Sequence, residues 1–482
     1  AEMNRREFMG AAAAAALMQA IPLAARAATS PPWSIGFEGL SDDLPPLDLK
    51  VSGAVPDACH GTLYRNGPTR FERGGRRYQH WFDPDGMIQA FTLGASGVSH
   101  KGRFVRTSKF LAEEEQGRFL RSGAGTYFPD SSPGRNNEDG NVANINVQEL
   151  NGELLALWEA GSAHRVDPVT LETLGVKTWS KELEGVPFSA HPHFDENGDL
   201  WNIGSVPFAA KPMLVLYHVG ADGVLRSARA HDLDFPGYMH DFVLTPRYLV
   251  ALNSSAVLGH GDTFVDSMHW EGSRPSQLLV FDRNDFELVA QIDVPPTFVF
   301  HFGNGSQEGN LLEFAACAYP DMSIVSHGMR RLARQEYGDY HTEAGLVRYR
   351  ADLKSAKAEV LPLDVNLEFP SYNTQQPFAP QSLLGSARLN PTESTFASAI
   401  ARVDVRSERL SSFDYGGGVI VEEPLFVPGP NGGYAVHSYL DFARQRTGIA
   451  VLAVDHLEDG PLMRAEMERV LPLGFHGCFM KS

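Results

Sequence analysis

The chain has 482 residues, of which 43% are hydrophobic and 21% are charged, so it can bury a large core and does not have the composition of a disordered protein. Its formal net charge is −18 and it has no cluster of Lys and Arg, which argues against nucleic acid as a partner. The three cysteines, Cys59, Cys317 and Cys478, are too few and too irregularly spaced for a disulfide framework or a thiolate metal site. We expect them to be small buried hydrophobic residues.

The N-terminus has the pattern of an export signal. Arg5 and Arg6 form a twin-arginine pair, an Ala-rich apolar stretch runs from Gly10 to Leu23, and Ala25-Arg26-Ala27 is an A-x-A cleavage site. The apolar stretch is too short to span a bilayer. We therefore interpret residues 1–28 as a twin-arginine signal segment, with an added remnant before Met3, and expect a periplasmic protein. A cytoplasmic Ala-rich helix is the alternative.

From about residue 35 to residue 482 the pattern predicts a single all-β domain. Short β-rich runs alternate with turns rich in Gly, Pro, Asn and Asp, such as 195–198 and 428–433. Many short strands over more than 400 residues favour a propeller over a sandwich, and the lack of a strict repeat means that its blades have diverged. The clearest predicted strands are Glu153–Trp158, Met213–Val219, Tyr248–Leu252, Gln277–Phe281, Gly418–Phe426 and Gly448–Val454.

Two segments have helical patterns, Thr107–Phe119 and Ser326–Tyr337. Both are expected to be insertions that cover one face of the propeller. No linker that would separate domains is present between them.

Four histidines lie in similar contexts, beside aromatic or small residues, which is the setting of a buried imidazole. A buried neutral imidazole is either packed in the core or binds metal or relays protons, and for each histidine taken alone the core role is the commoner one. Because each blade of a propeller can deliver one residue to the central axis, four histidines spread over nearly 300 positions can meet there. They are His191 in Ala-His-Pro-His, His240 in Met-His-Asp-Phe, His301 in Phe-His-Phe-Gly-Asn and His476 in Phe-His-Gly-Cys-Phe.

Two further motifs precede the four histidine motifs in the chain, Gly61–Pro68 (GTLYRNGP) and His80–Met87 (HWFDPDGM). In combination they resemble the carotenoid cleavage oxygenases, a family that includes stilbene-cleaving and retinoid-isomerising members. The resemblance runs from about residue 35 to the end. It implies a seven-bladed β-propeller with a helical and loop cap, and Fe(2+) on the propeller axis. The implied metal ligands are His191, His240, His301 and His476, with His193 as a neighbour and not a ligand.

The resemblance also implies that three glutamates, Glu159, Glu368 and Glu423, support the ligands. Four neutral imidazoles leave the 2+ charge of a buried ion uncompensated, and carboxylates that accept the ring N–H supply that charge and fix the imidazole tautomers. The chain departs from the family after the third histidine. Asn304-Gly305-Ser306-Gln307 replaces the usual Asn-Ala-aromatic-Glu, which keeps the ligand spacing but changes the next loop.

The implied reaction is the cleavage of a conjugated C=C bond by O2 to give two carbonyl products, with no flavin, nicotinamide or organic cosubstrate. Stilbene-cleaving members resemble one another in placing a lysine directly before the first glutamate, where this chain has Trp158. A tryptophan cannot bind a phenolate by charge, so a carotenoid or apocarotenoid is the expected substrate. The alternative is an aryl alkene of the stilbene, isoeugenol or 4-vinylguaiacol type, cleaved to an aromatic aldehyde. Trp158, Tyr127, Phe128 and the aromatics of 320–337 are the candidates for the wall of the substrate tunnel. For Tyr127, Phe128 and the aromatics of 320–337, ordinary packing is the alternative and the commoner role.

Two other classes remain open. An exported propeller could bind a ligand without chemistry, but such a module has no need of this His and Glu set. A propeller hydrolase or lactonase using Ca2+ or Zn2+ would need carboxylate-rich ligands, and the Gly-x-Ser-x-Gly and His-Glu-x-x-His motifs are absent. The expected partners are O2 and a hydrophobic alkene, with peripheral membrane contact for substrate uptake and no obligate protein partner.

Overall fold

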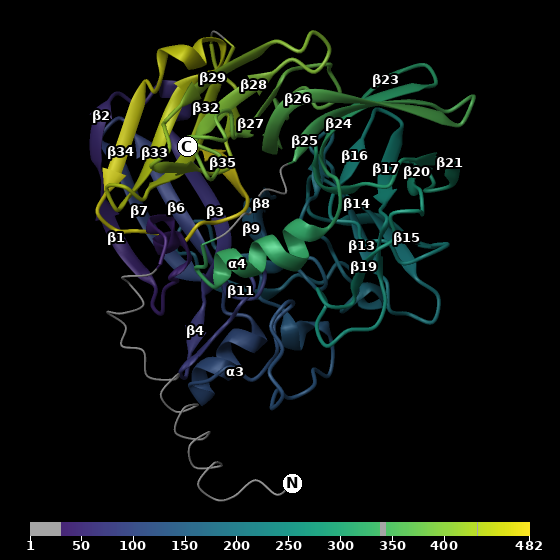
Figure 1. Cartoon of the computed structure of the whole chain (residues 1–482), viewed down its shortest axis with the longest axis horizontal. Helices are drawn as coiled ribbons and strands as arrows, with labels where there is room; N and C mark the ends of the chain where they lie inside the picture. The colour runs from purple at the N-terminus through teal and green to yellow at the C-terminus, as the bar shows by residue number, and fades with distance from the viewer. Residues whose placement is uncertain (1–29, 338–343, 431) are drawn as a thin grey trace, which may run out of the picture.

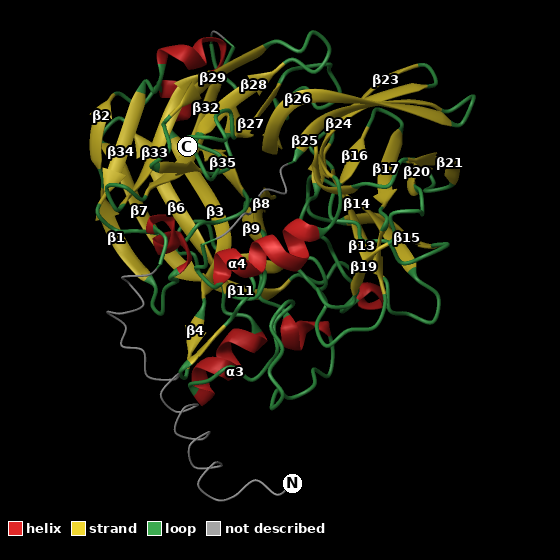
Figure 2. Ribbon diagram, in the orientation of Figure 1, coloured by secondary structure: helices red, strands yellow, loops and turns green. Residues whose placement is uncertain are grey.

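The computed structural model describes residues 30–337, 344–430 and 432–482. Strands dominate it, and the few helices lie outside the sheets (Figure 2). The predicted signal segment 1–28 lies outside the described residues. In the described ranges no helix is both long enough and apolar enough to cross a membrane.

The strands form seven antiparallel blades, as the resemblance implies, so the predicted β-propeller is confirmed (Figure 1). The first four blades are each built from strands in their order along the chain. Blade I is β8 (Asn146–Leu150), β9 (Glu153–Leu157), β10 (His164–Val166) and β11 (Thr173–Val176). Blade II is β12 (His193–Phe194), β13 (Leu200–Val206), β14 (Met213–Val219) and β15 (Leu225–Asp232). Blade III is β16 (Phe242–Leu244), β17 (Tyr248–Asn253), β20 (Ser276–Asp282) and β21 (Leu288–Val294). Blade IV is β22 (Phe298–Phe302), β24 (Leu311–Tyr319), β25 (Gly345–Asp352) and the first part of β26 (Lys357–Ser371), with β23 (Ser306–Glu308) beside β24.

Blades V to VII complete the ring. Blade V is the end of β26 with β27 (Leu383–Ala387), β28 (Ala399–Val403) and β29 (Leu410–Asp414). Blade VI is β30 (Val419–Val421), β31 (Leu425–Val427), β32 (Tyr434–Asp441), β33 (Arg446–Ala453), β34 (Met463–Met467) and β2 (Lys50–Gly53). Blade VII is β35 (Gly477–Lys481), β3 (Gly61–Arg70), β6 (Asp85–Gly94), β7 (Gly97–Phe104) and β1 (Leu44–Asp48).

Blade VII closes the ring by joining segments from opposite ends of the sequence. β35 pairs with β3 from Gly61↔Lys481 to Arg65↔Gly477. β1 then extends blade VII beside β7, while β2 extends blade VI beside β34. In Figure 1 the yellow strands β33 and β34 accordingly lie next to the purple strands β3, β6 and β7. The ring is thus held by backbone hydrogen bonds between distant parts of the chain.

The core is distributed between the blades. Because each blade packs face to face on its neighbours, its middle strands are buried on both faces, as in β17. In contrast, β7, which lies between β6 and the edge strand β1, alternates buried and partly exposed residues. Seven apolar clusters of described residues correspond to the seven interfaces between blades. Five of the six predicted strands were right to within two residues, and Met213–Val219 matches β14 at both ends.

One predicted strand is broken for a functional reason. Gly418–Phe426 divides into β30 and β31, and the break holds Glu422, Glu423 and Pro424. Pro424 has no N–H to donate to a ladder, and Glu423 turns toward the propeller axis.

The cap contains both predicted helices, with different bounds. α3 (Ser108–Gln116) begins after the N-cap Thr107, whose side chain accepts from the Phe110 N–H, and ends at Gly117 in the left-handed region (φ 63°). The second is a π-turn, η5 (Ile324–Gly328), that continues into α4 (Met329–Ala333). The hairpins β4 (Glu72–Arg73)–β5 (Arg76–Arg77) and β18 (Ala256–Leu258)–β19 (Met268–Trp270) and the short helices η1 (Pro32–Phe37), η2 (Asp57–Cys59), η3 (Asn137–Gly140), η4 (Lys181–Leu183) and η6 (Val454–Asp459) complete the described elements. All three cysteines are free, and Cys59 and Cys317 are buried.

Candidate metal centre

The centre of the propeller receives one chemically relevant residue from each blade. Four blades provide histidine at or just before their first strand, and the other three provide glutamate. In blade order the residues are Glu159, His191, His240, His301, Glu368, Glu423 and His476. Glu159 comes from the loop after β9, whereas Glu368 lies within β26. This convergence explains how four histidines that lie up to 285 positions apart in the sequence form one site.

The four histidines form a compact buried group. A ligand atom of each lies within 4.8 Å of those of the others, and all four residues are buried. The Nε2 atoms of His191 and His240 are 2.9 Å apart, and the Nε2 atom of His301 is buried without a hydrogen-bond partner. Lone pairs packed this closely repel one another unless a cation or protons lie between them. The donor set therefore fits a divalent metal ion that favours imidazole ligands.

Three of the histidines are oriented by the three predicted glutamates. His240 Nδ1 lies 2.6 Å from Glu159 Oε1, His301 Nδ1 lies 2.5 Å from Glu368 Oε2, and His476 Nδ1 lies 2.9 Å from Glu423 Oε1. Donation from each Nδ1–H leaves the Nε2 lone pair free to point to the axis. The structure places His191 without such a carboxylate partner among the described residues.

Burial sets the protonation of the site. It lowers the pKa of His191 and His476 well below the ordinary value, and the neighbouring imidazoles lower each further. Neutral imidazoles are the form that binds metal. Burial raises the pKa of Glu423 to about 7, whereas in Glu368 the same effect is outweighed by His301, which holds the pKa of that carboxyl below its usual range.

Two tyrosines hold two of the glutamates. The Tyr238 hydroxyl donates to Glu159 and lies 3.1 Å from both carboxylate oxygens, and the Tyr319 hydroxyl donates to Glu368 Oε1 at 2.8 Å. Burial raises the pKa of both phenols well above the ordinary value, so they act as donors. Phe369 takes a left-handed conformation (φ 53°), and its ring lies 5.4 Å from that of His301 and 5.1 Å from that of His476. Such strained backbone is retained where packing enforces it.

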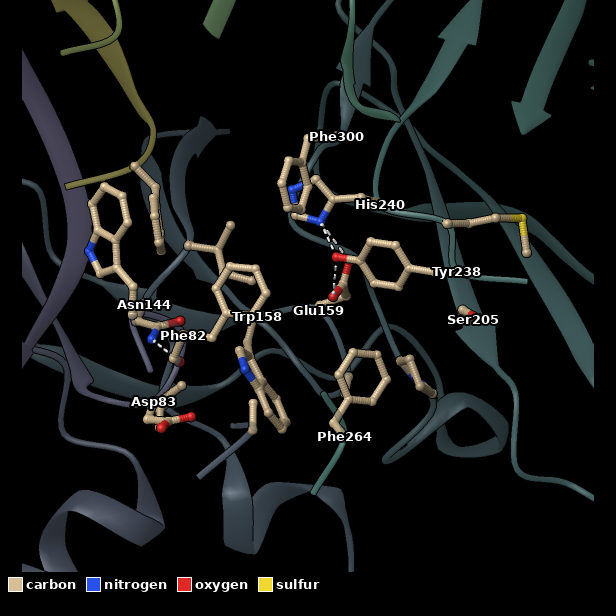
Figure 3. Close-up of a pocket in the computed structure, with 18 of the residues that line it drawn as sticks. Phe82, Asp83, Asn144, Trp158, Glu159, Ser205, Tyr238, His240, Phe264 and Phe300 are labelled. Atoms are coloured by element: carbon tan, nitrogen blue, oxygen red, sulfur yellow. Dashed lines mark hydrogen bonds and ion pairs between the residues drawn. The ribbon is translucent and has the colours of Figure 1, made fainter. Parts of the chain in front are cut away.

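A cavity of about 530 Å³ adjoins three of the four histidines, His240, His301 and His476. Most of its wall is apolar, including Phe82, Trp158, Phe264, Phe300 and Phe475. Figure 3 shows Phe82 and Trp158 to the left of Phe264, with Glu159, Tyr238 and His240 above Phe264. Lys109 of α3 and Met329 of α4 also border the space, so the cap covers the metal end of the propeller. Size and lining suit an elongated hydrophobic ligand.

Known proteins share this arrangement. Residues 38–481 match the family described as retinal pigment epithelial membrane protein. The chain is 28% identical to apocarotenoid-15,15'-oxygenase of Synechocystis sp., over 93% of this chain and 96% of that protein. It is 26% identical to carotenoid 9,10(9',10')-cleavage dioxygenase of Crocus sativus, over 92% and 88%. The solved structure of cobalt-substituted Synechocystis apocarotenoid oxygenase superposes with a TM-score of 0.83 at 25% identity, over 94% of this chain and 98% of that one.

The chain belongs to the carotenoid cleavage oxygenase family. The resemblance predicted from its motifs is thereby confirmed, and neither a ligand-binding propeller nor a propeller hydrolase finds support among these relatives. Carotenoid cleavage oxygenases depend on a metal, and the four-histidine site of this chain fits that dependence.

The structure corrects the predicted tunnel of this oxygenase. Trp158 lines the cavity, but Tyr127 and Phe128 do not, so that part of the prediction is wrong. Tyr127 is 51% exposed, and the Phe128 ring stacks on Tyr78 and Phe119 inside the cap. Between 320 and 337 the wall is formed by Ile324 and Met329, which are not aromatic.

Several residues of this oxygenase site were not predicted from the sequence. Tyr238 and Tyr319 are the main omissions, and period-2 alternation offered a signal for Tyr238, because residues 238 and 240 share one face of an extended chain. Asn304 holds the altered loop after His301, since its side-chain amide donates to Pro377 O and Ala379 O. Nothing in the local sequence of Phe264 or Phe300 indicates that they face a cavity.

Proposed function

We propose that the chain is a non-haem Fe(II) dioxygenase that cleaves a conjugated C=C bond of an apocarotenoid with O2, giving two carbonyl products. The observation that carries this proposal is a four-imidazole centre next to one large apolar cavity, with no carboxylate of the described residues in the ligand group. Imidazole suits iron, and a site with four protein ligands would leave room at the ion for O2.

When bound, iron would supply the activation of O2. His191, His240, His301 and His476 would hold it, and Glu159, Glu368 and Glu423 would fix three of the rings and balance the charge. The aromatic wall, with Phe300 and Phe475 near the histidines, would hold the alkene flat and exclude water from reactive groups. No described side chain is needed as a nucleophile or general acid.

The apocarotenoid assignment draws on three observations. The most similar relatives described above are named for apocarotenoid and carotenoid cleavage. The cavity wall is mainly apolar, and it includes Trp158, at the position where the family resemblance implies a lysine in stilbene-cleaving members. A tryptophan offers a large ring face and one N–H donor, which favours a long polyene over a small hydroxylated arene.

We further propose that substrate enters from a membrane surface. Phe208, which is 61% exposed, also borders the cavity, and Phe264 lies behind it at a ring distance of 6.5 Å. An exposed aromatic at a cavity mouth supports contact with lipid, from which a polyene is drawn. Binding to liposomes would be measured for wild type and Phe208→Glu. Equal binding by the two proteins would contradict the proposal.

Export by the twin-arginine route remains a proposal supported by the motif around Arg5 and Arg6. Cell fractionation of the chain and of a variant with both arginines replaced by lysine would test it. Recovery of the unaltered chain in the cytoplasm would contradict periplasmic export, and equal export of both proteins would contradict the twin-arginine route.

The metal and the chemistry are tested separately. Elemental analysis of the purified protein is expected to give about one iron per chain, and full activity with stoichiometric zinc or calcium would overturn the iron assignment. Aerobic incubation of the iron-loaded protein with β-apocarotenals, resveratrol, isoeugenol and 4-vinylguaiacol, with products identified by mass, tests the substrate.

Trp158→Lys sharpens the substrate test. We expect it to lower kcat/KM for an apocarotenal and raise it for a hydroxystilbene, because a buried ammonium rewards a phenolate by about 1.5–3 kcal/mol. If wild type instead prefers hydroxylated aryl alkenes and loses rate when the 4-hydroxyl is methylated, the apocarotenoid proposal is wrong and alkene cleavage stands.

A further inference from the structure

The carboxylate of Asp241 connects three neighbouring blades directly behind the histidines. Its Oδ1 lies 2.7 Å from His193 Nε2 and accepts from the Phe242 N–H at 2.7 Å. Its Oδ2 accepts from the Phe302 N–H at 2.9 Å. The residue is 4% exposed. A buried carboxylate with three donors has little freedom to move.

Each contact of Asp241 lies next to a different metal-ligand candidate. His193 is two residues after His191 in blade II, Asp241 itself follows His240 in blade III, and Phe302 follows His301 in blade IV. A shift of any one of these strands along its axis would stretch a hydrogen bond to the same carboxylate. One side chain therefore senses the relative positions of three ligand strands.

The His193 ring is itself fixed from a fourth blade. Its Nδ1 lies 3.1 Å from the hydroxyl of Tyr372, which follows β26 in blade V. The Phe242 ring packs edge-on against it at 4.7 Å. His193 therefore presents Nε2–H to Asp241 in one orientation, which gives a role to the second histidine of the first motif, one that is not part of the four-histidine group.

We propose that Asp241, with His193 as its donor, is a positioning residue that sets the spacing of His191, His240 and His301 before metal binds. This inference rests on the proposed metal-binding function. The closely packed imidazoles repel one another when no metal is bound, which raises the free energy of the empty site. The strands that carry them therefore need an interaction that holds them together without the metal. Asp241, which is not among the residues that line the cavity, provides it.

The chain offers a matched control for a merely structural role. In the same blade II, His218 Nε2 lies 2.7 Å from Asp199 Oδ2, which is the same kind of pair at the same distance. These side chains are 22% and 24% exposed and adjoin none of the four histidines in sequence. Loss of this pair should lower stability without changing how the site binds metal.

The test is Co(II) titration of the metal-free protein, followed by visible absorption and by thermal unfolding with and without Co(II). For Asp241→Asn we expect about 10–100-fold weaker Co(II) affinity, the range seen when partners behind metal ligands are lost. The amide would place an NH2 opposite an N–H or ring donor, so at least one contact is lost. The rise in Tm caused by Co(II) should shrink as well. His193→Ala should show a smaller change in the same direction, and Asp199→Asn should bind Co(II) like wild type.

An equal Co(II) affinity and an equal Co(II)-induced Tm rise in Asp241→Asn and wild type would overturn the inference, even if the metal-free variant unfolds at a lower temperature. If Asp241→Asn does not fold, His193→Ala removes only one of the three donors to Asp241 and decides the question by the same two measurements. Failure of wild type itself to bind Co(II) would instead overturn the proposed metal-binding function, and the positioning role with it.

Discussion

Two sides of the metal centre are built differently. On the cavity side, His240 is held by Glu159 and Tyr238, and all three border the space for substrate. On the closure side, His476 is held by Glu423, which also accepts from the Gly477 N–H at the start of β35. Arg65 of β3 donates to the carbonyls of Glu423 and Phe475 there.

The residues on the cavity side affect the reaction, whereas those on the closure side also hold the propeller ring together. Side-chain hydroxyls and carboxylates on the cavity side can be changed without disturbing a sheet ladder. On the closure side the same interactions that orient His476 also fasten blade VII, so a change affects both the metal and the ring. We therefore expect substitutions on the closure side to lower stability and activity together, and those on the cavity side to lower activity alone.

The largest effect is expected from deletion of residues 477–482. This removes β35 and its five-residue register with β3, exposing the edge of blade VII and releasing the segment that carries His476. We expect loss of cooperative thermal unfolding and an increase in aggregation, measured by circular dichroism and gel filtration. A truncated protein with a wild-type Tm would show that closure does not depend on this strand.

Replacement of a single histidine separates the sides further. His191→Ala, His240→Ala, His301→Ala and His476→Ala should each abolish activity, because each removes one of four ligands. His193→Ala should be milder. Only His476→Ala should also lower the Tm of the metal-free protein. The reverse order for His191→Ala and His193→Ala would mean that the ligand in the first motif is misassigned.

Replacement of the glutamates should be less severe. Glu159→Gln, Glu368→Gln and Glu423→Gln are each expected to cost about 10–100-fold in activity or metal affinity. Glu423→Gln should cost Tm as well, since Oε2 accepts from the Gly477 N–H. Thermal unfolding of the three metal-free variants distinguishes the sides. Equal Tm values would remove the distinction.

The smallest effect is expected from Tyr238→Phe. The Tyr238 phenol donates to Glu159, and loss of this hydrogen bond costs about 1 kcal/mol. Without it, the Glu159 carboxylate becomes a stronger acceptor for the N–H of His240. We expect a lower midpoint potential of the bound metal and a change of a few-fold in kcat, with an unchanged Tm. Tyr217→Phe, which removes a hydroxyl bonded to Pro187 O elsewhere in the propeller, serves as the control.

The sequence predicted the parts of the site that follow from short motifs. Each of the four histidines and three glutamates lies in a short motif that can be recognised in the sequence. The structure brings all seven together at the axis. The β-rich periodicity likewise predicted strands such as β14. Both depend on residues near one another in sequence.

What could not be predicted depends on contacts between distant segments. The cavity wall combines cap, loop and strand residues, so no local pattern distinguishes Phe264, which lines it, from Phe128, which packs inside the cap. Tyr319 reaches Glu368 across 49 positions, and Asp241 reaches Phe302 across 61. The predicted helix Thr107–Phe119 extends beyond the end of α3 at Gln116, because Gly117 takes the left-handed conformation and ends the helix.

The distribution of ligands around the ring has a consequence for the order of folding. His191, His240 and His301 come from three consecutive blades, whereas His476 reaches the axis only after β35 finds β3, a pairing of residues about 400 positions apart. Contacts of such high sequence separation form slowly. A partly folded chain can therefore present a three-imidazole site with Asp241 already behind it while blade VII is still open. Metal captured at that stage would accompany ring closure, and the concentration of free metal during refolding would then change the rate of the last step.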